Sequence, residues 1–154
     1  MNYKELKNRH QEEVNNFPLG FAFSNEQFRE MMNKWGLTEN DTDKIYSIGG
    51  GGFVQKKDSD AMDEMFTKHT KEMNDAMKDP RFAEDAFYYE MLNHEYPINL
   101  QKNFDVLGCF YDVEYHDDDY NEEHYFEELN LPTEIRLAYE NAKVKCLKAF
   151  GYEI

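Results

Sequence analysis

Residues 44–56 read Lys-Ile-Tyr-Ser-Ile-Gly-Gly-Gly-Gly-Phe-Val-Gln-Lys, and this stretch decides between an all-helical fold and a mixed one. Two short β-prone runs flank four consecutive glycines, which is typical of a β-hairpin whose turn needs positive φ angles. A phosphate-binding loop is the alternative, but neither a Gly-Lys-Ser/Thr motif nor a helical pattern follows the glycines. The stretch therefore predicts one glycine-turn hairpin in an α+β fold.

Amphipathic helices are predicted on both sides of this hairpin. Apolar residues recur at helical spacing over residues 3–15, 24–36, 58–78, 80–96 and 133–150. A short helix is expected over 99–107, and the apolar run 17–23, which contains Pro and Gly, is expected to be a buried connector. Ser24 and Gln27 have capping-box spacing, and Gly36 stands where a left-handed cap would end that helix. The predicted fold class is α+β and helix-dominated.

The 154 residues fit one domain, and 40% hydrophobic residues with 16% aromatics can build a core of useful size. No linker rich in Ser, Gly or Pro divides the chain, and no segment repeats another, so residues 1–154 are expected to form a single domain. A methionine-rich stripe on the helix over 58–78 is expected to face this core: Ala61, Met62, Met65, Phe66, His69, Met73, Ala76 and Met77.

The chain is strongly acidic, with a formal net charge of −15 and a pI near 4.6. This balance predicts repulsion from nucleic acid and from anionic membranes, and attraction to basic protein surfaces. Cys109 and Cys146 are too few for a disulfide framework and suit a reducing compartment. Without a signal peptide or a run of about 18 apolar residues, the protein is expected to be soluble and cytoplasmic, with no membrane contact.

The acidic excess is concentrated in the second half of the chain. Residues 79–135 hold 16 acids against 2 bases, and residues 103–135 hold eleven acids with no Lys or Arg. From 111 to 128 the carboxylates alternate with Tyr, His and Phe, whereas disordered acidic tails are usually poor in aromatics. We therefore expect a folded acidic surface within the domain. The alternative is a merely solvated face whose aromatics point into the core.

Three stretches carry a family resemblance: Lys-Asn-Arg-His-Gln-Glu-Glu-Val-Asn at 7–15, Phe-Pro-Leu-Gly-Phe-Ala-Phe-Ser at 17–24, and the stretch 44–53. They resemble a family of small acidic proteins of unknown function carried by phages, plasmids and other bacterial mobile elements. The resemblance covers about the first 95 residues and leaves the region 111–128 outside the common core. It implies a gene that travels with mobile DNA, a setting where short acidic proteins include anti-restriction and anti-CRISPR inhibitors.

A nucleic-acid mimic is the function that charge and setting favour. Duplex DNA presents one negative charge per roughly 1.7 Å of axis, and a folded carboxylate surface could occupy the basic channel of a nuclease effector. Interleaved tyrosines could anchor such an interface. The partner-binding residues predicted on this basis are Asp112, Glu114, Tyr115, Asp117, Asp118, Asp119, Tyr120, Glu122, Glu123, Tyr125, Glu127 and Glu128.

Two alternatives belong to other classes. Asp117, Asp119, Asn121, Glu123, Tyr125 and Glu128 have the spacing of a calcium loop, although Glu122 replaces its turn glycine, and looser cation binding by an accessory protein is also open. His10, His69, His94, His116 and His124 lie near carboxylates and could serve a small enzyme, but none belongs to a recognised catalytic motif. We predict no catalytic residue, cofactor or metal ion, and no nuclease, phosphatase or nucleotide-hydrolysing activity.

Overall fold

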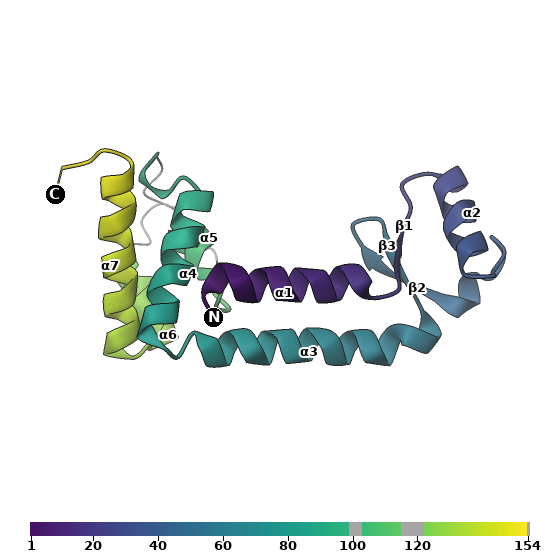
Figure 1. The fold of residues 1–154 in the computed structure, drawn as a ribbon, viewed down its shortest axis with the longest axis horizontal. Helices are drawn as coiled ribbons and strands as arrows, with labels where there is room; N and C mark the ends of the chain where they lie inside the picture. The colour runs from purple at the N-terminus through teal and green to yellow at the C-terminus, as the bar shows by residue number, and fades with distance from the viewer. Residues whose placement is uncertain (99–102, 115–121, 154) are drawn as a thin grey trace. The chain divides into compact units, whose positions relative to one another are not determined.

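The computed structural model describes residues 1–98, 103–114 and 122–153. Helices dominate these residues, and a small antiparallel sheet accompanies them, so the predicted α+β class is confirmed (Figure 1). The elements are α1 (Tyr3–Asn16), β1 (Leu19–Phe21), α2 (Asn25–Lys34), β2 (Ile45–Gly49), β3 (Gly52–Gln55), α3 (Ser59–Ala76), α4 (Pro80–Asn93), α5 (Asn103–Leu107), α6 (Glu122–Leu129) and α7 (Thr133–Ala149).

The chain divides into two compact units. The first unit is formed by residues 9–70, and the second unit is formed by residues 1–8 together with residues 71–154. Helices α1 and α3 each contribute residues to both units. We describe each unit by itself, and the expectation of a single domain stays a prediction. Within the described residues, no helix is both long enough and apolar enough to cross a membrane.

The glycine-turn hairpin is confirmed in the first unit. Strands β2 and β3 pair antiparallel, with a register shift between Ser47 and Gly49. Gly49, Gly50 and Gly51 have φ angles of 85°, 59° and 77°, which residues with a Cβ rarely adopt. The turn leads directly into β3 and not into a helix, so it lacks the geometry of a phosphate-binding loop.

The buried connector expected over 17–23 is wrong, because this run contains a third strand. Strand β1 pairs antiparallel with β3, which gives the sheet order β1-β3-β2. Phe21 and Phe23 are 58% and 75% exposed. Successive strand residues point to opposite faces, so only alternate members of the run can face a core. Strand β1 is only three residues long and pairs with a strand far away in the sequence. Its alternation of apolar and polar residues is too short to be recognised as a strand from the sequence.

Helix α2 begins and ends where the sequence predicts. The Ser24 hydroxyl accepts a hydrogen bond from the Gln27 N–H at 3.2 Å, and the Gln27 side chain accepts one from the Phe23 N–H at 2.8 Å. Gly36 follows the helix with a φ of 71°. These contacts satisfy N–H groups that a helix start otherwise leaves without partners.

The core stripe predicted for α3 is only partly correct. Met77, just past the helix, is buried, and Met73 and Ala76 pack against the same core. At the other end Ala61 and Phe66 are exposed, and His69 is the residue of α3 that is buried. Apolar residues at helical spacing give a helix one apolar face. The spacing does not show which part of that face packs against other elements.

The core of the second unit forms mainly between α4 and α7, which lie side by side in Figure 1. Helical spacing predicts most of their buried residues: Phe82, Ala83, Ala86, Phe87 and Met91 on α4, and Ile135, Ala138, Tyr139, Ala142 and Cys146 on α7. It also predicts His94, which is half-buried, and Ala149 and Phe150, which are exposed. Asn103 at the start of α5 is also buried, and it accepts hydrogen bonds from the Tyr96 and Tyr139 hydroxyls at 2.8 and 2.5 Å. Tertiary packing of these faces supplies most of the stability of such helices.

Candidate functional site

The predicted partner-binding residues fall into two groups. Tyr115, Asp117, Asp118, Asp119 and Tyr120 lie outside the described residues. The structure describes the others, namely Asp112, Glu114, Glu122, Glu123, Tyr125, Glu127 and Glu128, and the last five of these lie on α6.

Helix α6 is folded onto the core through its aromatic side chains. Tyr125 and Phe126 are 3% and 4% exposed, and the Phe126 ring lies edge-on to the Tyr139 ring at 5.0 Å between centroids. Its position on the helix directs Tyr125 into the core, and the interface role predicted for it stays a prediction. The carboxylates around it stay on the surface, as an amphipathic acidic helix requires.

Two of the acids on α6 are neutralised by α7. Lys143 Nζ donates to Glu122 Oε2 at 2.8 Å, and the Arg136 guanidinium pairs with Glu123. The hydrogen bond from Arg136 lowers the pKa of Glu123. These two predicted surface acids thus join helices of the same unit.

Other acids of the segment remain exposed. Asp112, Glu114, Glu127 and Glu128 are all exposed. Among the described residues, no base pairs with Asp112, Glu114 or Glu127. Among the described residues, the fold therefore neutralises Glu122 and Glu123 and leaves these four acids facing solvent.

The calcium-loop alternative is contradicted by α6. The helix begins at Glu122, the sixth position of the proposed loop, where a calcium loop makes its sharp turn. Tyr125, at the ninth position of the proposed loop, is buried in the core. Residues 122–128 thus form a helix that packs on α7 and not a cation-binding loop.

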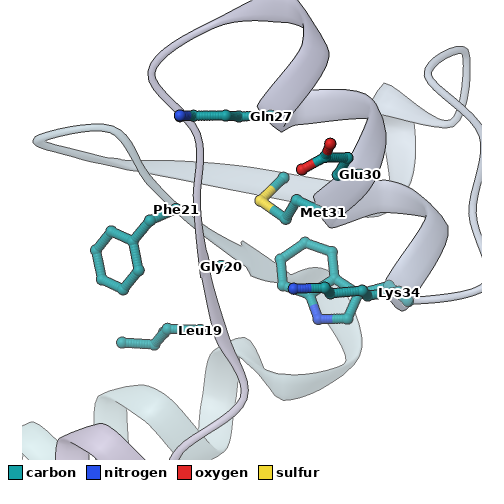
Figure 2. Close-up of a pocket in the computed structure, with 8 residues that line it drawn as sticks. Leu19, Gly20, Phe21, Gln27, Glu30, Met31 and Lys34 are labelled. Atoms are coloured by element: carbon teal, nitrogen blue, oxygen red, sulfur yellow. The ribbon is translucent and has the colours of Figure 1, made fainter.

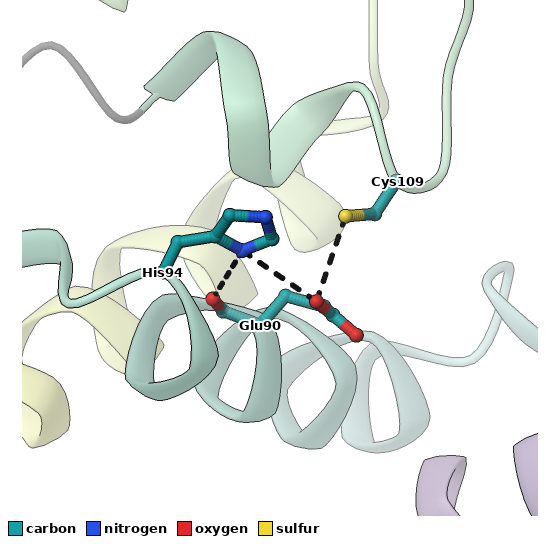
Figure 3. Close-up of side chains that lie close together, drawn as sticks. All are labelled: Glu90, His94 and Cys109. Carbon is teal, nitrogen blue, oxygen red and sulfur yellow. Dashed lines mark hydrogen bonds and ion pairs between the residues drawn. The ribbon is translucent and has the colours of Figure 1, made fainter.

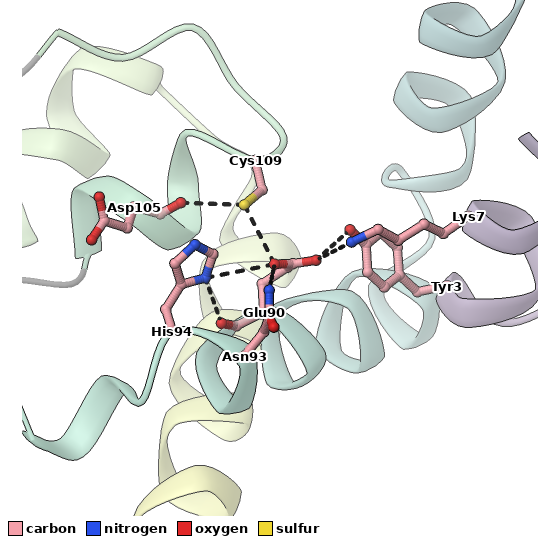
Figure 4. Close-up of polar contacts among 7 residues, drawn as sticks. All are labelled: Tyr3, Lys7, Glu90, Asn93, His94, Asp105 and Cys109. Carbon is pink, nitrogen blue, oxygen red and sulfur yellow. Dashed lines mark hydrogen bonds and ion pairs between the residues drawn. The ribbon is translucent and has the colours of Figure 1, made fainter. Parts of the chain in front are cut away.

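A densely connected polar cluster surrounds Glu90 on α4 (Figure 4). Although only 2% exposed, its carboxylate has donors on both oxygens. Oε1 accepts from the Tyr3 hydroxyl at 2.7 Å and from Lys7 Nζ at 2.9 Å, and Oε2 accepts from the Asn93 amide at 3.3 Å. A buried carboxylate needs such partners, because leaving it unpaired would cost several kcal/mol.

His94 and Cys109 complete this cluster. The His94 Nδ1 lies 2.8 Å from the main-chain oxygen of Glu90 and 3.6 Å from Oε2. The Cys109 thiol donates to Asp105 O at 3.3 Å and lies 3.6 Å from Glu90 Oε2. Burial raises the pKa of Cys109 to about 12, and the Glu90 charge and hydrogen bond act in the same direction.

In the first unit, His69 contacts another histidine and a carboxylate. The His69 ring stacks on His10 at 4.0 Å between centroids, and its Nε2 lies 2.5 Å from Glu13 Oε2. His69 is 8% exposed and has a carboxylate partner, which is the arrangement of a satisfied buried histidine.

A hollow of about 230 Å³ lies between β1 and α2 (Figure 2). A Cβ on Gly20 would lie 2.5 Å from Met31 Sδ, so glycine permits this close approach of strand and helix. Glu30 and Lys34 stand at its edge. Small-molecule sites usually enclose about 300–1,000 Å³, so this hollow is smaller than a typical site.

A family model described as Family of unknown function (DUF7659) matches residues 2–123. The chain belongs to this family. The DUF7659 match extends past residue 96 and includes the first part of the acidic segment. No curated protein and no solved structure matches the chain.

Sequence reasoning on this DUF7659 chain missed the meeting of Glu90 with Cys109. Glu90 and His94 are four residues apart, so their proximity on one helical face could have been recognised. The contact of Cys109 with Glu90 depends on the turn after α5, and no local sequence pattern predicts that turn. Glu90 was also left out of the predicted core face of α4, because a carboxylate is rarely buried without partners that only the fold supplies.

Proposed function

We propose that the chain is an acidic inhibitor that binds a basic, nucleic-acid-handling protein and presents carboxylates where that protein holds phosphates. The contact surface is the acidic block from Asp112 to Glu128. The partner's chemistry is that of a nuclease effector with a channel lined by Lys and Arg. In this proposal the chain acts by binding, without a catalytic residue of its own.

The observation that carries the proposal is the incomplete neutralisation of the acidic segment. Bases of α7 pair with Glu122 and Glu123, yet no base among the described residues pairs with Asp112, Glu114 or Glu127. Acidity that served solubility alone would be expected to spread over the whole surface, since net charge acts on the molecule as a whole. Here it is concentrated on one segment.

A folded helix also favours binding over simple solvation. Helix α6 is held by Tyr125 and Phe126, so its carboxylates are presented on an ordered backbone and lose little conformational freedom on binding. Complementary charge steers the encounter and raises the association rate, and salt screens it. The resemblance to proteins of phages and plasmids supports a role against a nucleic-acid-targeting defence protein of a bacterial host.

The test compares two variants that each lose three negative charges. The first carries Asp112→Asn, Glu114→Gln and Glu127→Gln. The control carries Glu12→Gln, Asp63→Asn and Glu64→Gln, which are exposed acids of the first unit. Each variant and the wild-type chain are immobilised, bacterial lysate is passed over them at low salt, and retained proteins are identified by mass spectrometry.

The proposal predicts that the wild-type chain and the control retain the same nucleic-acid-binding protein. The first variant should bind it about tenfold more weakly, mostly through slower association. Equal retention by the first variant and the control would refute the assignment of the acidic segment. Retention only of proteins that bind no nucleic acid would refute the choice of partner.

A further inference from the structure

Glu90, His94 and Cys109 bring a carboxylate oxygen, an imidazole nitrogen and a thiol sulfur to within 4.8 Å of one another (Figure 3). No other group of three such side chains meets this spacing in the part of the chain that the structure describes. We propose that these three residues bind one Zn²⁺ ion, with a water molecule at the fourth position.

The separations fit a tetrahedral metal ion. Zinc binds sulfur at about 2.3 Å and nitrogen or oxygen at about 2.0–2.2 Å, so its ligand atoms lie roughly 3.4–3.6 Å apart. Cys109 Sγ lies 3.6 Å from Glu90 Oε2, and the imidazole, thiol and carboxylate ligand atoms all lie within 4.8 Å of one another. Small side-chain rotations would close the remaining separation between the imidazole and the thiol.

The hydrogen bonds around the cluster leave the ligand atoms available. The main-chain oxygen of Glu90 can only accept, so a neutral His94 ring donates from Nδ1 and keeps its lone pair on Nε2. Figure 3 shows Nε2 on the Cys109 side of the ring. The two oxygens of Glu90 have different partners: Oε1 accepts from Tyr3 and Lys7, whereas Oε2 accepts from the Asn93 amide and faces His94 and Cys109. Such outer hydrogen bonds orient the ligands of zinc sites.

The donor set selects the class of metal. Thiolate and imidazole ligands favour Zn²⁺ and similar transition metals, whereas Ca²⁺ and Mg²⁺ need oxygen ligands in larger number. Binding converts the Cys109 thiol to a thiolate and releases its proton to solvent. The ion would connect the end of α4 to the turn after α5, two segments of the same unit.

The experiment uses Co²⁺ as a spectroscopic substitute for Zn²⁺ in the full chain. The wild-type protein should bind one Co²⁺ with a sulfur-to-cobalt charge-transfer band and the visible bands of four-coordinate cobalt. Zn²⁺ should displace Co²⁺ at one equivalent, and excess Ca²⁺ or Mg²⁺ should not. Cys109→Ser should abolish the charge-transfer band, whereas Cys146→Ser, a matched thiol control, should retain it.

Two further variants keep the test independent of folding defects. His94→Gln alters a half-exposed side chain and should weaken cobalt binding about tenfold or more, while Glu95→Gln, an exposed neighbour, should not. Helical circular dichroism without metal should be unchanged in all four variants. Absence of the charge-transfer band in the wild-type protein, its persistence in Cys109→Ser, or displacement of Co²⁺ by Ca²⁺ would overturn the site.

Discussion

At the scale of single residues, Glu90 helps to set the protonation of Cys109. Burial opposes ionisation of Glu90, but hydrogen bonds from Tyr3 and Lys7 and the Lys7 charge outweigh it and lower the pKa of this carboxyl. The ionised Glu90 then adds to burial in raising the pKa of Cys109 to about 12. Cys109 is therefore protonated at neutral pH. It is a weak nucleophile even though the residue is exposed to solvent.

Glu90→Gln should lower the pKa of Cys109, because it removes a negative charge while burial continues to raise that pKa. At a fixed pH below the pKa, the thiolate fraction rises roughly tenfold for each unit by which the pKa falls. The measurement is the iodoacetamide alkylation rate of Cys109 against pH, with Cys146→Ala in both proteins and a chelator present. Glu95→Gln serves as the control. Unchanged alkylation in Glu90→Gln would show that Glu90 does not set the reactivity of Cys109.

At the scale of elements, the hairpin turn depends on glycine at positive φ. A Cβ on Gly50 would contact nothing within 4 Å, so any cost of substitution is conformational. Gly50→Ala should lower the free energy of unfolding by about 1–2 kcal/mol, and Gly50→Asn should lower it less, because Asn tolerates the left-handed region. Urea unfolding of the three proteins measures both differences. Equal stability of Gly50→Ala and the wild-type protein would contradict the turn geometry.

The elements predicted correctly are those with local signals. Four glycines fix a turn, Ser24 with Gln27 fixes a helix start, and the apolar faces of α4 and α7 follow helical spacing over many residues. Strand β1 and the uncovered end of α3 escaped prediction because pairing with β3 and coverage by other elements are long-range properties. The two candidate sites differ for the same reason. The acids of α6 lie in one segment and can be recognised in the sequence, whereas the contact between Cys109 and Glu90 depends on the fold.

At the scale of the whole molecule, charge is distributed unevenly and the fold preserves that unevenness. Residues 136–154 hold 4 bases against 2 acids, and two of those bases, Arg136 and Lys143, pair with acids of α6. The larger acidic excess upstream therefore keeps a field that extends about a Debye length, roughly 8 Å at physiological ionic strength. A basic partner would experience this field before contact.

The most direct test of nucleic-acid mimicry is competition for the captured partner between the chain and duplex DNA. The chain's affinity for that partner is measured by calorimetry with increasing concentrations of a short duplex, at low and at physiological salt. We predict that the duplex and the chain exclude one another, and that the affinity of each falls as salt rises. A ternary complex in which the chain keeps its full affinity while the duplex is bound would contradict the proposed mimicry.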